Sequence, residues 1–173
     1  MGLKQKISAF LHRKDSKAYY WNMRMKAKTS KNPIAAKYYY EKHRRWMEKN
    51  CAGIALGAEF ASVPVFPHGV TGIFVSEGAR IGKDCVIFHQ VTIGSNMLPG
   101  SPGHGSPILG DNVYIGCGAK IIGGVKIGNN VRIGANCVVT RDVPNNATVV
   151  LEKPRVIVRE EVQDNRFVKY SQV

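Results

Sequence analysis

Residues 109–139 read LGDNVYIGCGAKIIGGVKIGNNVRIGANCVV, and this stretch decides the fold. An aliphatic residue recurs at every sixth position, at Leu109, Ile115, Ile121, Ile127, Ile133 and Val139, and upstream in the same step at Val75, Ile81, Ile87 and Ile93. Glycine follows the aliphatic residue at six of these ten positions, and turn-forming and small residues fill most of the remaining places. A period of six matches neither a helix, with about 3.6 residues per turn, nor a strand alternation. It predicts a solenoid of short strands in which each aliphatic residue points inward and stacks on its equivalent one coil away.

Two interruptions of this repeat are candidate functional regions, because a solenoid carries function where its regularity breaks. The first, FPHGVTGIF at residues 66–74, is three residues longer than one repeat. The second, SNMLPGSPGHGSP at residues 95–107, is a loop rich in Pro, Gly and Ser that adds ten residues. Each holds one histidine, His68 or His104.

The repeat resembles the hexapeptide-repeat family over residues 51–158. This resemblance implies a mainly β fold, a left-handed parallel β-helix with three hexapeptides per coil. The runs HGVTGI at 68–73, IFHQVTIG at 87–94 and PILGD at 107–111 resemble the serine acetyltransferase-like branch of that family. Its enzymes transfer an acetyl group from acetyl-CoA to a hydroxyl group. The resemblance implies that His68 is the general base, a role that suits imidazole because it titrates near neutrality.

The remaining site residues follow from the same resemblance. His104 is the candidate second catalytic histidine and could reach the site of a neighbouring subunit. His89 and Asn96 are candidate acceptor-binding residues, although a solvated corner explains His89 about as well. Residues along the later coils are expected to hold the pantetheine arm of acetyl-CoA, and two basic residues its phosphates: Gly116, Ala119, Gly134, Ala135, Lys153 and Arg155. The family also implies a homotrimer with each active site between subunits.

Several positions depart from the serine acetyltransferase pattern. Pro67 replaces the aspartate that precedes the first histidine, and Ser106 stands where the second histidine is expected. These losses concern recognition of an amino acid, so we expect the acceptor to be a saccharide hydroxyl, on a cell-surface polysaccharide or its lipid-linked precursor. The first alternative is a serine O-acetyltransferase of cysteine biosynthesis. The second is a non-catalytic hexapeptide scaffold that binds a partner through its loops.

Residues 1–50 differ from the repeat region, because they carry a net charge of +11 out of +13 for the whole chain. Helix is predicted over residues 3–28 and 33–49, divided at Asn32-Pro33, since proline favours the first helical position. This basic segment has three interpretations: a peripheral contact with an anionic inner-membrane face, attraction of an anionic acceptor, or a cap on the end of the solenoid. Residues 159–173 are expected to form a C-terminal tail.

Composition excludes several other classes of protein. No apolar run approaches the roughly 18 residues of a membrane span, and the N-terminus shows no secretory signal, so a cytoplasmic location is expected. The four cysteines lack C-x-x-C spacing and the five histidines lack metal-ligand spacing, so no metal is expected. No nucleic-acid reader motif accompanies the positive charge. Cys117 has no neighbouring His or Lys in sequence to lower its thiol pKa, which disfavours it as an acyl-carrying nucleophile.

Overall fold

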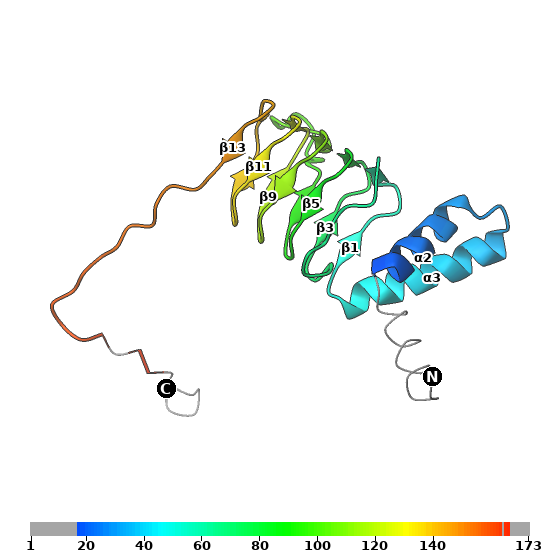
Figure 1. Cartoon of the computed structure of the whole chain (residues 1–173), viewed down its shortest axis with the longest axis horizontal. Coiled ribbons are helices and arrows are strands. Elements are labelled where there is room, and N and C mark those ends of the chain that lie inside the picture. The colour runs from blue at the N-terminus through cyan, green and yellow to red at the C-terminus, as the bar shows by residue number, and fades with distance from the viewer. Residues whose placement is uncertain (1–16, 164, 167–173) are drawn as a thin grey trace.

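The computed structural model describes residues 17–163, 165 and 166, and shows two helices followed by a three-sided β-helix (Figure 1). Helices α2 (Lys17–Thr29) and α3 (Pro33–Lys49) come first. The first sheet holds β1 (Gly53–Ile54), β3 (Phe74–Val75), β6 (Thr92–Gly94), β9 (Lys120–Ile122) and β12 (Val138–Val139). The second holds β2 (Glu59–Phe60), β4 (Arg80–Ile81), β7 (Ile108–Leu109) and β10 (Lys126–Ile127). The third holds β5 (Val86–Ile87), β8 (Tyr114–Ile115), β11 (Arg132–Ile133) and β13 (Thr148–Val149).

The predicted aliphatic ladders form the core of this left-handed β-helix. All strand pairs are parallel, and Val75 is in register with Ile93, which in turn is in register with Ile121. Every one of the ten aliphatic residues of the repeat is at most 3% exposed. Neighbouring strands lie about 4.8 Å apart, so these side chains remain in van der Waals contact along the axis. The prediction of inward, stacked aliphatic residues is therefore confirmed.

The corner between the third and the first sheet is a column of tight turns. The turn residues Gly72, Gln90, Gly118 and Asn136 all have a positive φ, between 58° and 70°. Their amides bond the coil before, as when Gly118 N–H donates to the carbonyl of His89. Glycine and asparagine adopt this left-handed conformation at low cost, which explains their recurrence in the repeat.

The two helices cover the first coil of the β-helix, as the cap interpretation of the basic segment predicts. Tyr20 and Met47 are buried in the same core cluster as Ile54, and Trp21 packs edge-on against Phe60. Arg24 is 2% exposed, and its Nη2 donates to the carbonyls of Ala55, Leu56 and Ala58 at 2.9, 3.1 and 2.5 Å. This guanidinium satisfies backbone acceptors that a solenoid otherwise leaves open at its first coil.

Helix α3 begins at Pro33, as predicted, because the Asn32 side chain accepts bonds from the N–H groups of Ile34 and Ala35. The first predicted helix, residues 3–28, corresponds to α2 in the described part, and residues 3–16 lie outside it. Most of the N-terminal lysines that carry the membrane interpretation also lie there, so membrane contact stays a prediction. No helix among the described residues is long and apolar enough to cross a membrane.

After β13 the chain leaves the β-helix. Residues 150–163 have no helix or strand and run outward as an extended arm (Figure 1). Its side chains are exposed, including Val156 at 81% and Val158 at 89%. The arm carries Lys153 and Arg155 away from the coils.

Candidate active site

Two of the predicted site residues, His68 and His89, meet at the corner between the third and the first sheet. Their Nδ1 atoms lie 3.0 Å apart, and the ring centroids are 5.0 Å apart at an interplanar angle of 38°. His68 is exposed and His89 is half-buried. Phe88 meets the edge of the His68 ring at 5.3 Å and packs against Tyr114 of β8 at 5.1 Å.

The extra residues of the 66–74 segment produce this contact. Val65 bridges Val86, and Phe74 pairs with Thr92, so both ends of the segment are in register with the next coil. The surplus residues therefore bulge from the corner between these two points. Gly69, with a φ of 76°, turns the bulge, and Val70 enters the core at 1% exposure. His68 is left outside, directly against His89 of the next coil.

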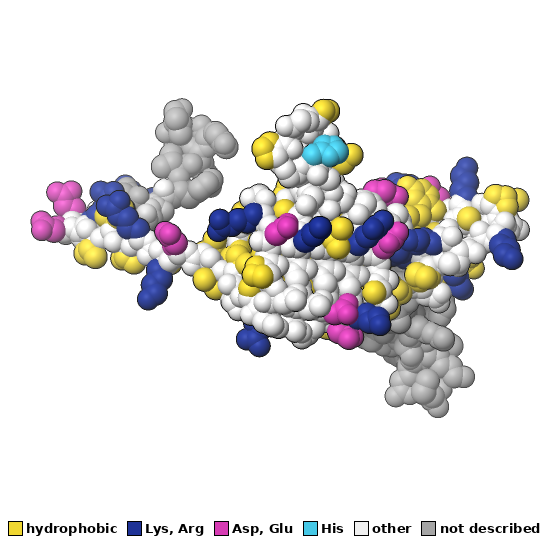
Figure 2. All heavy atoms as spheres, turned by 90° about the horizontal axis from the view of Figure 1, so that it is seen from above, with side chains coloured by type: hydrophobic (Ala, Val, Ile, Leu, Met, Phe, Trp, Pro, Cys, Tyr) yellow, Lys and Arg dark blue, Asp and Glu magenta, His cyan; other side chains and the backbone are white. Residues whose placement is uncertain are grey.

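The loop 95–107 stands at a different corner, between β6 of the first sheet and β7 of the second. Asn96 and Gly105 close its base as an antiparallel bridge. The Asn96 side chain donates to Ser101 Oγ and to the Pro102 carbonyl, and accepts from Leu98 N–H, so it holds the loop together. His104 is exposed on this loop. Figure 2 shows a protrusion that carries apolar and histidine side chains. On the body beneath it, basic and acidic side chains alternate in a row.

Within one chain the two histidines predicted to be catalytic do not come together. His89 lies just before β6 and Ser95 just after it, so the length of this strand separates the histidine pair from the loop. Ser106, at the place of the family's second histidine, is bonded to Ser95 Oγ at 2.7 Å within a chain of hydroxyls that includes Ser76. Ser106 therefore belongs to the base of the loop.

The residues predicted to hold acetyl-CoA are divided by the structure. Gly116 lies beside Cys117 at the same corner, one coil below His89. Gly134 and Ala135 lie at this corner one coil further on. Ala119, in contrast, is 0% exposed, and both its N–H and its carbonyl are bonded within the β-helix. Ala119 therefore offers no group to a ligand, because its position in the repeat is the inward one. Lys153 and Arg155 lie on the extended arm and do not meet these residues in the single chain.

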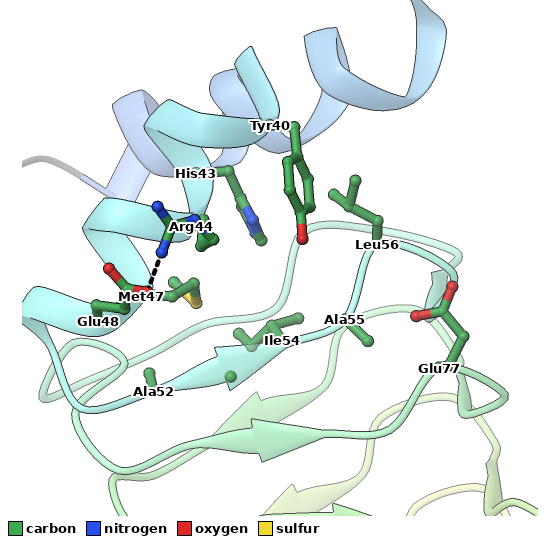
Figure 3. Close-up of a pocket in the computed structure, with 11 residues that line it drawn as sticks. Tyr40, His43, Arg44, Met47, Glu48, Ala52, Ile54, Ala55, Leu56 and Glu77 are labelled. Atoms are coloured by element: carbon green, nitrogen blue, oxygen red, sulfur yellow. Dashed lines mark hydrogen bonds and ion pairs between the residues drawn. The ribbon is translucent and has the colours of Figure 1, made fainter. Parts of the chain in front are cut away.

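A cavity of about 600 Å³ lies elsewhere, between α3 and β1 (Figure 3). Tyr40, His43, Met47, Ile54 and Leu56 are among its lining residues, and the figure shows the His43 ring pointing toward Ile54. Within the described part of the chain, His43 Nε2 has no hydrogen-bond partner. Burial, together with the charge of Arg24, lowers the pKa of His43 to about 4. None of the described residues predicted for the active site lines this cavity.

The described residues form no metal cluster, and their four cysteines are free. They contain no group of three His, Cys, Asp or Glu side chains that could hold a metal ion. Cys85 and Cys137 are buried core residues, and burial raises the pKa of the Cys85 thiol. Cys117 is half-buried at the corner one coil beyond His89.

The comparisons with known proteins agree with one another. Residues 106–141 match the bacterial transferase hexapeptide model of six repeats. The chain is 44% identical over 98 residues to a serine acetyltransferase of Mycobacterium tuberculosis, covering 57% of this chain and 40% of that protein. It is 38% identical over 104 residues to a serine acetyltransferase of Helicobacter pylori, covering 60% of this chain and 59% of that protein. The chain thus spans only about half the length of these relatives.

Solved structures agree with these matches. The serine acetyltransferase of Neisseria gonorrhoeae superimposes with a TM-score of 0.65 at 30% identity, over 78% of this chain and 52% of that one. The soybean serine acetyltransferase complexed with serine superimposes with a TM-score of 0.60 at 34% identity, over 78% of this chain and 53% of that one.

These comparisons correct the predicted acceptor. The saccharide prediction is wrong, because the similar proteins and structures are serine acetyltransferases. The prediction relied on Pro67 and Ser106, which replace the aspartate and the second histidine of the family pattern. The aspartate is the expected partner of the first histidine. The structure shows another partner, His89, which the sequence hides because the two residues are 21 positions apart.

Proposed function

We propose that the protein is a serine O-acetyltransferase. The premise is that residues 106–141 match the bacterial transferase hexapeptide model. Its acetyl donor is acetyl-CoA, and its acceptor is the hydroxyl group of serine. The similarity to serine acetyltransferases over 57–60% of the chain supports the substrates. The observation that carries the chemistry is His68, which is exposed on a bulge of the β-helix and is paired through Nδ1 with His89.

The reaction needs a base at this corner. His68 Nε2 takes the proton of the serine hydroxyl as the oxygen attacks the carbonyl carbon of the thioester. The carbon–sulfur bond then breaks, and the departing thiolate of CoA takes that proton from the imidazolium. The products are O-acetylserine and free CoA, so protons and electron pairs balance. Along the corner below His89, the backbone at Gly116, Gly134 and Ala135 is the proposed course of the pantetheine arm.

The site is proposed to be completed between two copies of the chain in a trimer. Within one copy, the loop 95–107 and the histidine pair lie at opposite ends of β6. A neighbouring copy that packs against the first sheet would bring its own loop, with His104, to the histidine corner. The exposed apolar residues Phe74 and Val138, at 50% and 64%, lie on this sheet and suit such a contact.

Release of free CoA from acetyl-CoA, followed with a thiol-reactive dye, tests the proposal. Serine, threonine and a panel of monosaccharides are offered as acceptors at equal concentration. We expect release to depend on serine and to be lost in His68→Ala, while Lys83→Gln, at an exposed turn on another corner, behaves like the wild type. Serine-independent release would refute the acceptor. No release with any acceptor would favour the non-catalytic scaffold.

A further inference from the structure

The contact between His68 and His89 restricts where each imidazole ring carries its hydrogen. Two imidazole Nδ1 atoms at 3.0 Å are within hydrogen-bond distance, so one Nδ1 carries the hydrogen and the other accepts it. A neutral imidazole has a single N–H, so the choice at Nδ1 also fixes the state of Nε2. If His68 donates, its Nε2 is a bare lone pair. If His89 donates, His68 carries its proton on Nε2 and is no base there.

The surroundings hold this pair in place. His89 lies in a regular coil, where its carbonyl accepts from Gly118 N–H, and Gln90 N–H donates to Thr71. Lys120 Nζ donates to the carbonyls of Gln90 and Gly118, at 2.9 and 2.7 Å, and so ties the turn that presents His89. Phe88 meets the His68 ring edge-on at an interplanar angle of 86°. Among the described residues, no carboxylate is bonded to either ring, which leaves His89 as the side-chain partner of His68.

We propose that His89 is a positioning residue: its Nδ1 accepts the hydrogen of His68 Nδ1 and keeps the Nε2 lone pair of His68 free to take the acceptor's proton. The catalytic role of this hydrogen bond rests on the proposed acetyl transfer. The direction of the bond does not, and it can be measured without turnover. When His68 becomes an imidazolium, the same bond strengthens, because its donor is then charged. His89 thereby does for this chain what a carboxylate does beside a histidine base in other enzymes.

The charged and titratable groups around the pair are few. Lys120 adds a positive charge at the turn that follows His89, where its Nζ is bonded to the carbonyls of Gln90 and Gly118. Cys117 occupies the corner one coil on, and the Tyr114 ring packs on Phe88. Of the two arrangements, only the one in which His89 accepts leaves Nε2 of His68 free for the acceptor's proton.

The direct test is the tautomer of His68, read by nitrogen-15 NMR on the full chain labelled at histidine, at alkaline pH. Signals are assigned by their loss in His68→Gln and His89→Gln. We expect His68 to carry its hydrogen on Nδ1 in the wild type, and to shift toward the Nε2–H form in His89→Ala. A wild-type His68 protonated on Nε2, or a tautomer indifferent to His89→Ala, would overturn the inference. This readout needs no turnover, so it stands apart from a failure of the proposed acetyl transfer.

Kinetics gives the second readout. His89→Ala is expected to lower kcat by about 10- to 100-fold with the KM for acetyl-CoA unchanged, because the base spends less time in the reactive tautomer. His89→Asp supplies an acceptor that cannot donate when ionised, so it should restore most of the rate. It should also move the acidic limb of the pH–rate profile to higher pH, since a carboxylate stabilises the imidazolium. Lys83→Gln is the matched control. Full activity in His89→Ala, or an Asp variant as slow as the Ala variant, would contradict the role.

Discussion

At the scale of single residues, the histidine corner depends on where three extra residues fall in the repeat. His68 lies on the bulge at Gly69, outside the regular coil, while Val70 is buried in the core. The regular coil below supplies His89 at the place where the bulge ends. The two Nδ1 atoms thus come within 3.0 Å because one histidine lies on an irregular coil and the other on the regular coil next to it.

Replacing His68 by alanine tests the role of the base. We expect kcat with serine to fall by about 10²–10⁴-fold, the usual contribution of a general base, because the hydroxyl is a weak nucleophile without it. Binding of acetyl-CoA, measured by calorimetry, should stay nearly unchanged. His104→Ala should have a smaller effect on kcat if its loop only covers the site. A His68→Ala enzyme with wild-type kcat would remove His68 from the mechanism.

At the scale of elements, the helices and the first coil form one packed unit. Tyr20 stacks on Trp46 at 4.7 Å and on His43 at 5.5 Å, so the two helices share an aromatic layer above the β-helix. The Arg24 guanidinium lies over the Trp21 and Phe60 rings and bonds three backbone carbonyls. Among the described basic residues of this segment, Arg24 is therefore a buried structural arginine.

Arg24→Met should destabilise the protein by about 3 kcal/mol or more, because the buried carbonyls lose their donor. The measurement is urea unfolding of the full chain, with Arg45→Met, an exposed position on α3, as the matched control. The control should change stability by less than about 0.5 kcal/mol. Equal effects of the two substitutions would show that Arg24 has no capping role.

His43 gives the same unit a pH dependence. Its pKa is lowered to about 4 in the folded protein, whereas an unfolded chain titrates near the ordinary value of about 6.5. The contribution to stability is therefore complete above about pH 6.5 and is lost as the pH falls toward 4, by up to about 3 kcal/mol. Urea unfolding at pH 7.5, 6 and 5 measures the loss, which His43→Leu should reduce. A stability that does not differ between pH 7.5 and 5 would contradict the buried, neutral ring.

Much of the fold could be predicted from sequence, because the period of six places one aliphatic residue per strand and nothing in tertiary packing opposes it. The start of α3 was equally local, since Asn32 and Pro33 define a helix N-terminus by themselves. The pairing of His68 with His89 was not predictable, because it depends on how a bulge lies on the next coil. The burial of Arg24 was difficult to predict. The one indication in the sequence is that Arg24 follows Tyr20, Trp21 and Met23, and many other basic residues surround it in the sequence.

At the scale of the whole molecule, the proposed site is divided. The loop with His104 and the corner with His68 lie at opposite ends of β6 in the first sheet, and the arm after β13 leads away from the β-helix (Figure 1). A single copy therefore presents two half-sites, and the proposed trimer would join the halves of neighbouring copies.

Sedimentation equilibrium at micromolar concentration tests the assembly. We expect a mass close to three chains of 19.1 kDa, because the half-sites of one copy cannot meet. Mixing His68→Ala and His104→Ala chains after dissociation should then create some sites with both histidines intact. A mass of one chain together with full activity would contradict a site shared between copies.

The central claim, acetyl transfer to serine by the His68 corner, is tested most directly by identifying the product. The full chain is incubated with acetyl-CoA carrying an isotopically labelled acetyl group and with serine, and the serine is analysed by mass spectrometry beside a His68→Ala reaction. The account predicts labelled O-acetylserine that accumulates with free CoA in the wild type and is nearly absent in the variant. Unlabelled serine in the wild-type reaction, or equal labelling in the two reactions, would contradict it.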